Sequence, residues 1–295
     1  VFVDRPDDFD KRTVNNKVFR LVFGNSLVTS DGDYWKRQRR IAAPAFHHQR
    51  IRGFATTMCD SVDRTLEGWR TFSDGDVIDF DAEMITLTLD VVTRCLIGAK
   101  STTELAEVLK RELLPMLEYG SFKMPRPWYP GLWAYTPRNR RFLRGREAVR
   151  EAITRIIAER HAGGTEHEDL LSMLMSSVDE ETGEKMDDIQ LRDEVITIVL
   201  AGYETTTNLL DWTFFALAQN PDVRAKLEGE LESVLGDRQR PDFDDLGALV
   251  YAEAVIKESM RMYPPAWLMV RRAAAAETVL GRTAPPGSLM FVSPY

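Results

Sequence analysis

The sequence predicts a mainly α-helical protein with a small β portion, folded as a single domain over residues 1–295. Most of the chain carries apolar residues at the three- and four-residue spacing of amphipathic helices. Residues 187–219 begin with two aspartates and have an apolar middle, which predicts a long, buried central helix. Short β-like runs bounded by glycine and proline follow residue 266, and the β portion is placed there.

Composition and charge exclude several classes of protein. Hydrophobic residues make up 44% of the chain and charged residues 28%, which excludes a disordered or collagen-like protein. A net charge of −8 argues against a general nucleic-acid binder. Cys59 and Cys95 form no disulfide framework, so we expect a reducing, cytoplasmic location. The longest apolar run, residues 195–201, is too short to span a membrane.

The first half of the chain is predicted to be helical with two interruptions. Residues 33–73 predict helices broken near Pro44, and residues 82–98 predict a helix with one buried face. Residues 76–80 alternate, which is typical of a short strand. Four prolines between residues 120 and 137 predict an irregular, aromatic-rich loop.

The second half continues with helices and ends in strands. An arginine-rich helix is predicted over residues 138–161, followed by the central helix. Asn220-Pro221 ends the central helix and begins another that runs to about Leu235. One more helix is predicted over residues 248–262, where a double proline stops it.

The ends of the sequence predict an internal fragment. The chain starts at Val1 rather than methionine and stops at Tyr295, just after the apolar run 289–292. We therefore expect an incomplete domain that is truncated at both ends. An N-terminal anchor upstream of Val1 stays an open alternative.

The first chemical motif, Ala-Gly-Tyr-Glu-Thr-Thr, occupies residues 201–206 in the middle of the long helix. Glycine costs about 1 kcal/mol relative to alanine inside a helix, and a buried acid such as Glu204 is costly without a partner. Ala201 and Gly202 would form a shallow depression, and the Thr205 hydroxyl can reach the Ala201 carbonyl. The motif is therefore either a functional site or a helix-packing notch with a satisfied hydroxyl.

Two further motifs place polar side chains on shared helix faces. Glu258 and Arg261 are three residues apart, face each other and precede the double proline, which suggests partial burial. Trp35 and Arg39 are four residues apart, so an indole N–H and a guanidinium form a donor pair suited to a carboxylate. Each motif alone also fits an ordinary solvated helix face.

Taken together, the motifs resemble the cytochrome P-450 superfamily of heme-thiolate monooxygenases. Their order matches the family's C, I and K helices, and Arg271-Arg272-Ala273 resembles its R-x-A element. The resemblance covers essentially the whole chain. It implies a cytochrome P-450-like fold with a long central I helix.

The resemblance also implies roles for these residues. Thr205 and Glu204 would be the catalytic pair that supplies protons during oxygen activation. Ala201 and Gly202 would leave room for oxygen and substrate above the heme.

The remaining motif residues would hold the cofactor or the fold. Trp35, Arg39 and Arg271 would bind the heme propionates. Glu258 and Arg261 would form a buried structural ion pair needed for heme incorporation.

The chain departs from the family at the iron ligand. In the family a cysteine supplies the thiolate, in a Phe-x-x-Gly-x-x-x-Cys-x-Gly loop after the K helix and its strands. No cysteine follows Arg261, and Cys59 and Cys95 lie upstream without that loop. No metal ligand is therefore assigned in this chain. The iron-binding cysteine is expected beyond Tyr295, and the fragment alone is expected to be inactive.

The predicted function is that of a heme b-dependent monooxygenase that inserts one atom of O2 into an apolar organic substrate. Electrons would come from NAD(P)H through a ferredoxin, flavodoxin or flavin reductase. We hypothesise that Lys36, Arg37 and Arg40 take part in docking this donor.

Two functions from other classes stay open. A non-catalytic helical scaffold or pseudoenzyme would differ in heme content. A magnesium-dependent isoprenoid lyase or synthase would need a DDxxD face, and Asp187-Asp188 and Asp244-Asp245 lack the third aspartate at that spacing.

Overall fold

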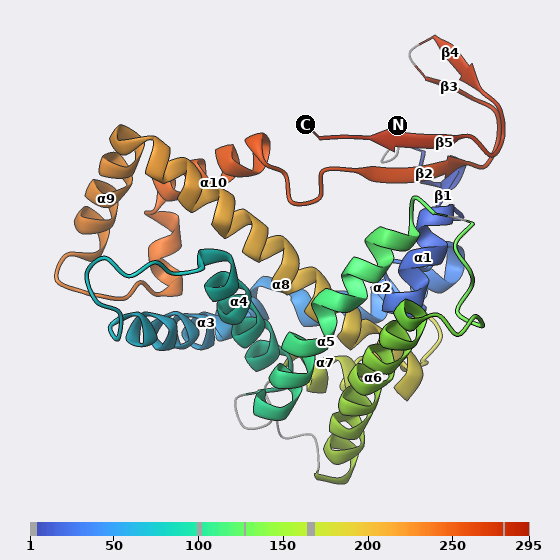
Figure 1. Cartoon of the computed structure of the whole chain (residues 1–295), viewed down its shortest axis with the longest axis horizontal. Coiled ribbons are helices and arrows are strands. Elements are labelled where there is room, and N and C mark those ends of the chain that lie inside the picture. The colour runs from blue at the N-terminus through green and yellow to red at the C-terminus, as the bar shows by residue number, and fades with distance from the viewer. Residues whose placement is uncertain (1–4, 99–101, 127, 164–168, 280, 295) are drawn as a thin grey trace.

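The computed structural model describes residues 5–98, 102–126, 128–163, 169–279 and 281–294, and within these ranges the chain is mainly helical (Figure 1). The α-helices, in chain order, are α1 Val14–Phe23, α2 Gly32–Ala42, α3 His48–Trp69, α4 Phe80–Ile97, α5 Thr102–Lys123, α6 Pro137–Gly163, α7 Leu170–Ser176, α8 Asp188–Gln219, α9 Pro221–Leu235 and α10 Val250–Met262. Short 3-10 helices are η1 Pro6–Asp8, η2 Ala43–Phe46 and η3 Phe243–Gly247. No helix in the described ranges is both long and apolar enough to cross a membrane.

The strands are short and antiparallel. They are β1 Phe9–Asp10, β2 Met269–Ala273, β3 Glu277–Val279, β4 Arg282–Ala284 and β5 Leu289–Val292. The sheet has the order β1-β2-β5, and β3 and β4 form a separate two-stranded sheet. Phe9 lies opposite Ala273, and Arg272 donates from Nε to Asp10 Oδ1 at 2.9 Å. This pairing brings the segment before α1 beside the strand that carries Arg271.

The central helix α8 crosses the molecule, and its start is set by local chemistry. Asp187 caps the helix by accepting from the Gln190 N–H at 2.8 Å, and Gln190 accepts from the Asp187 N–H at 3.1 Å. Its 32 residues span about 48 Å at about 1.5 Å per residue.

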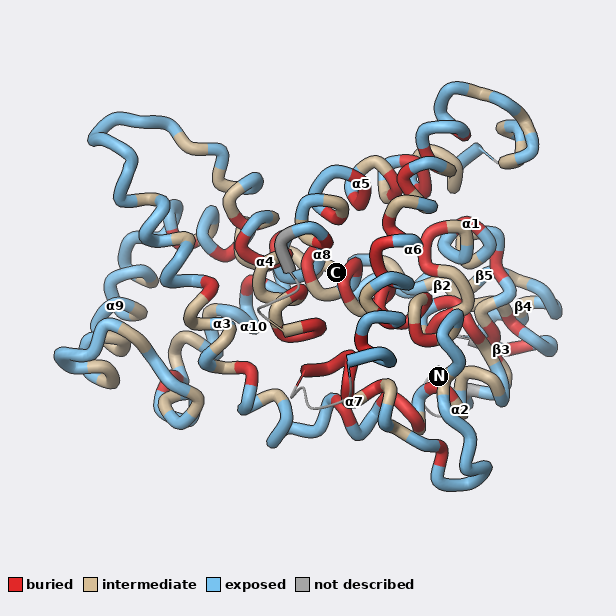
Figure 2. Tube along the Cα trace, turned by 90° about the horizontal axis from the view of Figure 1, so that it is seen from below, coloured by how far each residue is buried: buried red, intermediate tan, exposed pale blue. Residues whose placement is uncertain are grey.

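The hydrophobic core forms where α8 packs on α4 and α6, and where α5 packs on the same two helices; Figure 2 shows the buried residues gathered there. On α8 the buried side chains lie mainly before residue 201, for example Val199 and Leu200. Figure 2 also shows α9 as largely exposed, and none of its residues is buried. On the second half of α8, Ala201, Glu204 and Thr205 are exposed, and we call this side of the helix its open face.

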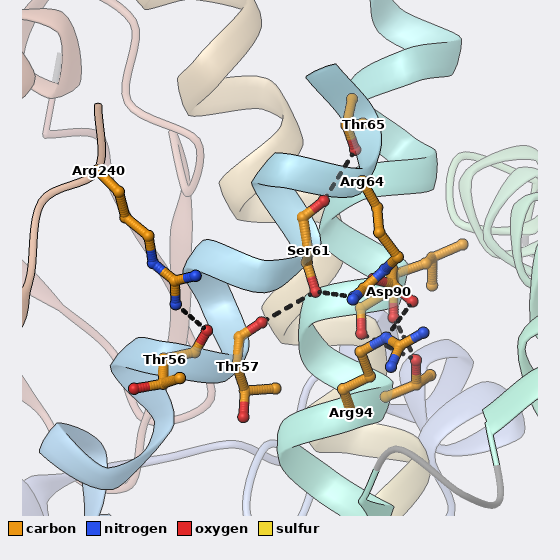
Figure 3. A network of polar contacts seen from close by, with 10 residues as sticks. Thr56, Thr57, Ser61, Arg64, Thr65, Asp90, Arg94 and Arg240 are labelled. Atoms are coloured by element: carbon orange, nitrogen blue, oxygen red, sulfur yellow. Dashed lines mark hydrogen bonds and ion pairs between the residues drawn. The ribbon is translucent and has the colours of Figure 1, made fainter. Parts of the chain in front are cut away.

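A polar network ties α3 to α4 and to the segment before η3 (Figure 3). The Arg64 guanidinium bridges the Ser61 hydroxyl at 2.8 Å and the Asp90 carboxylate at 2.5 Å, and Arg94 donates to the same carboxylate at 2.6 Å. Arg240 donates to the Thr56 carbonyl at 3.0 Å. The two cations hold the pKa of Asp90 below its usual range, against the opposing effect of burial.

Two expectations about the fold need correction, and one is confirmed. Residues 76–79 form no strand, because Asp79 instead caps α4 by accepting from the Ala82 N–H at 3.2 Å. The break near Pro44 that was predicted within residues 33–73 is confirmed, because η2 separates α2 from α3 there. The irregular loop begins after Lys123 rather than at residue 120, because α5 continues through Pro115 to that point.

Candidate active site

The acid–alcohol motif lies where α8 passes from the core to its open face. The Thr205 hydroxyl donates to the Ala201 carbonyl at 2.6 Å, as the spacing predicted. Ala201, Glu204 and Thr205 are exposed, so the prediction of a buried acid is wrong. The face of α8 that packs on α4 holds Tyr203 instead, which is 4% exposed.

Gly202 has a packing reason to be glycine. A Cβ at this position would lie 3.0 Å from Val92 Cγ2 on α4, so any larger residue would crowd Val92 where the two helices pack. The helix-packing interpretation thus accounts for Gly202, whereas Ala201 and Thr205 lie on the open face.

Glu204 borders two hollows. One, of about 610 Å³, is also lined by Asn208, Trp212, Tyr263 and Trp267, and the Trp212 and Tyr263 rings stack with centroids 4.3 Å apart. The second, of about 480 Å³, lies against α4 and α5 and is lined mostly by apolar side chains. These walls partly desolvate the carboxylate and raise the pKa of Glu204 although the residue is exposed.

A second group of residues gathers cations around Trp35 on α2. Arg39 lies over the Trp35 ring at 5.7 Å from its centroid, as the shared helix face predicted. Lys11 lies over the same ring at 5.3 Å, and the charge of Arg271 on β2 acts on Lys11. Arg39 forms no ion pair within the described ranges. We call Lys11, Trp35, Arg39 and Arg271 the cation cluster.

Lys11 is the member of the cation cluster that was not predicted from the sequence. Its ammonium donates to the Leu27 carbonyl at 3.0 Å, and its backbone N–H donates to Asp31 Oδ2 at 2.9 Å. Burial and the nearby Arg271 charge lower the pKa of Lys11 to about 8. Lys11 directly follows strand β1, which brings it near Arg271. This contact could not be predicted from the sequence, because the partner strand β2 lies more than 250 residues away.

Glu194, two helical turns before Ala201 on α8, is a buried acid close to the cluster. It is 1% exposed, and burial raises its pKa from 4.5 to about 7. Its oxygens accept from the Leu27 N–H at 2.9 and 3.1 Å.

This acid gives the first testable prediction. Its pKa is higher in the folded chain than in the unfolded chain, so its contribution to stability is complete below about pH 4.5 and is lost as the pH rises through about 7. The free energy of unfolding, measured with urea between pH 5 and 8, should therefore decline with pH more steeply for wild type than for Glu194→Gln. Asp222→Asn, at an exposed acid in the first turn of α9, should keep the wild-type slope. Equal slopes for wild type and Glu194→Gln would contradict this prediction.

Glu258 and Arg261 pair on α10, but the pair is not buried. Arg261 donates to both carboxylate oxygens at 2.8 and 2.7 Å. The side chains are 55% and 69% exposed, respectively, for Glu258 and Arg261, so the predicted burial is wrong. The physical reason is that α10 packs on α8 and α9 through its other faces, and no described element covers this one.

The basic residues proposed for donor docking already have partners. Arg40 donates to Asp179 Oδ1 at 2.8 Å and holds the pKa of that buried carboxyl at about 2. Arg37 pairs with Glu184 in the same segment. Lys36 is exposed and has only long contacts, of 3.8 Å to Asp7 and 4.0 Å to Asp33. Two of the three residues proposed for docking, Arg37 and Arg40, therefore have their charge paired within the chain.

Neither cysteine has the surroundings of a metal-binding thiolate. Cys95 is buried in α4, and burial raises the pKa of its thiol to about 11. Cys59 on α3 donates to the Pro241 carbonyl at 3.5 Å. Cys95 is therefore a buried packing residue, and Cys59 is a partly exposed thiol.

The fold and the site thus define a mainly α-helical protein with an exposed acid–alcohol motif on its central helix and a cation cluster nearby. A model of the cytochrome P450 family matches residues 1–295, and the chain belongs to this family.

Several curated proteins are similar over nearly the whole chain. Cyclooctat-9-en-7-ol 5-monooxygenase of Streptomyces melanosporofaciens is 34% identical over 98% of this chain and 62% of its own length. Cyclooctatin synthase of the same organism is 35% identical over 93% of this chain and 59% of its own length. Pentalenene oxygenase of Streptomyces avermitilis is 33% identical over 97% and 62%. This chain therefore spans about 60% of the length of these relatives.

Proposed function

We propose that the protein containing this chain is a heme-dependent monooxygenase that inserts one atom of O2 into an apolar organic substrate. The observation that carries the proposal is the placement of Ala201 and Thr205 on the open face of α8, two and three helical turns after Glu194, which accepts from the Leu27 N–H beside the cation cluster. Membership of the family supports it, and the family implies a heme cofactor.

The residues of the chain fit two parts of a heme group. The cation cluster offers two guanidiniums, an ammonium and an indole N–H, which suit the carboxylates of a porphyrin. The small Ala201 side chain leaves the open face of α8 accessible to a flat ring. When bound, heme supplies the redox-active iron at which dioxygen is activated. Its cysteine ligand is expected beyond Tyr295.

Two residues of α8 are proposed to handle protons. The Thr205 hydroxyl donates its own proton to Ala201, so its oxygen remains an acceptor toward the open face. The raised pKa of Glu204 lets this carboxyl hold a proton closer to neutral pH than an ordinary glutamate. Together they would relay protons from solvent to the oxygen that is being reduced.

The substrate and the partner are proposed at the level of chemical class. Two relatives are named for the oxygenation of pentalenene and of cyclooctat-9-en-7-ol, which supports an apolar substrate here. The apolar hollow against α4 and α5 supports the same class. We propose that a ferredoxin, flavodoxin or flavin reductase delivers electrons from NAD(P)H. The free thiols of Cys59 and Cys95 agree with a cytoplasmic location.

The cofactor site is tested by removing its cations in the complete protein. We expect Arg39→Ala and Arg271→Ala each to weaken heme binding by about 10- to 100-fold, because each loses one charge-assisted hydrogen bond to a carboxylate. Transfer of heme to an excess of apomyoglobin measures the change. Arg224→Ala, at an exposed ion pair on α9, is the matched control. If both cluster variants kept heme as well as this control does, the assignment of the cation cluster would be wrong.

A further inference from the structure

The buried half of α8 holds the loop between α1 and α2 through two adjacent acids. Asp193 Oδ2 accepts from the Asn25 N–H at 2.9 Å, and Glu194 accepts from the Leu27 N–H. Gly24 has φ +65°, and a Cβ there would lie 2.0 Å from the Asp193 carboxylate. The loop can therefore approach α8 this closely only with glycine at position 24.

The two acids differ in how their charges are compensated. Asp193 Oδ1 accepts from Arg192 at 2.8 Å. Glu194 has no cation within ion-pair distance in the described ranges, and the Leu27 N–H is the hydrogen-bond donor that it is seen to use. A glutamine could accept the same N–H without the cost of burying a charge. The hydrogen bond to Leu27 therefore does not explain why an ionisable acid, and not glutamine, occupies position 194.

The Leu27 peptide group links Glu194 to the cation cluster. Its N–H points to Glu194, and its carbonyl accepts from the Lys11 ammonium at 3.0 Å. An anion at the N–H end and a cation at the carbonyl end polarise one peptide in the same sense, so each strengthens the other hydrogen bond. Lys11 in turn lies over Trp35, beside the charge of Arg271.

We infer that Glu194 is a positioning residue for the cation cluster: through the Leu27 peptide it fixes the Lys11 ammonium over Trp35 and keeps it charged next to Arg271. The inference rests on the proposed function only in assigning the cluster to a carboxylate-bearing cofactor. The link itself lies entirely within the chain.

The other charged groups around this link have defined effects. Asp31 acts with Glu194 to favour the charged form of Lys11, whereas Arg271 and burial oppose it. Asp193, on the same helix, disfavours ionisation of Glu194, and Lys11 favours it. Tyr34 on α2 also lies within reach of the Glu194 charge. Loss of one of these negative charges should therefore lower the pKa of Lys11 further.

Two variants separate the charge of Glu194 from its hydrogen bond. Glu194→Gln keeps an acceptor for the Leu27 N–H but removes the charge, so the pKa of Lys11 should fall below that of wild type. Glu194→Leu removes both, so the Leu27 peptide loses its contact with α8 while Asp193 still holds Asn25, and the pKa of Lys11 should rise toward that of an exposed lysine as its contact with the Leu27 carbonyl is lost. We therefore expect acetylation of Lys11 at pH 8, where Glu194 is mostly ionised, to be at least about twofold faster in Glu194→Gln and slower in Glu194→Leu.

The experiment is competitive acetylation of the complete protein from pH 6 to 10, with Lys11 followed by peptide mass spectrometry. Asp188→Asn removes the same charge from an exposed position on α8 and should match wild type. If Glu194 has a purely structural role, the two variants should not shift the pKa of Lys11 in opposite directions. The inference would be overturned if the acetylation profiles of Lys11 in both variants coincided with the profile in Asp188→Asn. If Glu194→Leu does not fold, the Glu194→Gln profile alone decides. Acetylation profiles of Lys11 recorded without hemin test the link from Glu194 to Lys11. If added hemin does not slow the acetylation of Lys11, that result counts against the proposed cofactor and not against this link.

Discussion

Thr205→Val should lower the rate of product formation by about 100-fold in the complete protein while leaving substrate affinity nearly unchanged. Valine has the shape of threonine but no hydroxyl, so the acceptor oxygen that faces the open side of α8 is lost. Removal of one group in a proton relay typically costs about 10²- to 10⁴-fold. Product formed per NAD(P)H consumed is the measurement, because electrons should still be used when protons are not delivered correctly.

Two neighbouring substitutions make the Thr205 result specific. Thr206→Val changes the next exposed threonine on the same helix and should retain most of the activity. Thr205→Ser keeps the hydroxyl and should restore coupling. Equal losses in Thr205→Val and Thr206→Val would show that the helix, and not the hydroxyl, is what matters.

Arg160→Met should destabilise the chain by about 3–5 kcal/mol, because it leaves the buried Asp169 carboxylate without its cation. Arg160 and Asp169 have side chains that are 5% and 6% exposed, with an Arg160 Nη1 to Asp169 Oδ1 distance of 2.8 Å. Arg160 Nη2 also donates to the Ile97 carbonyl at 3.1 Å, so one guanidinium joins α6, α7 and the end of α4. Urea unfolding at pH 7 measures the change.

The control for Arg160 lies on the same helix. Arg155 pairs with Glu104, but both side chains are more than half exposed. Arg155→Met should therefore change stability by well under about 1 kcal/mol. Similar losses in the two variants would mean that burial of the Arg160 pair is not the source of its effect.

The parts of the fold that were predicted correctly depend on local chemistry. Helix α8 begins and ends within one residue of the prediction, because Asp187 caps it and Asn220-Pro221 stops it. Helix α5 was not predicted, because Pro115 and Gly120 lie inside it and packing against α6 overrides their low helix propensity.

The parts of the site that were missed depend on distant segments. Trp35 and Arg39 share one helix face, so their proximity follows from spacing alone. The contact of Lys11 with this pair requires the loop at Leu27, which Glu194 holds from a helix 167 residues further along the chain. Burial of Glu204 and of the Glu258–Arg261 pair was predicted wrongly, because periodicity does not say which element covers a given helix face.

The central claim is that this fold holds heme, and the heme content of the complete protein tests it most directly. We expect about one heme per chain after purification and a reduced carbon monoxide complex with the absorption of a thiolate-ligated iron. A folded protein that purifies without heme and binds no added hemin would contradict the account, and the chain would then be a helical scaffold.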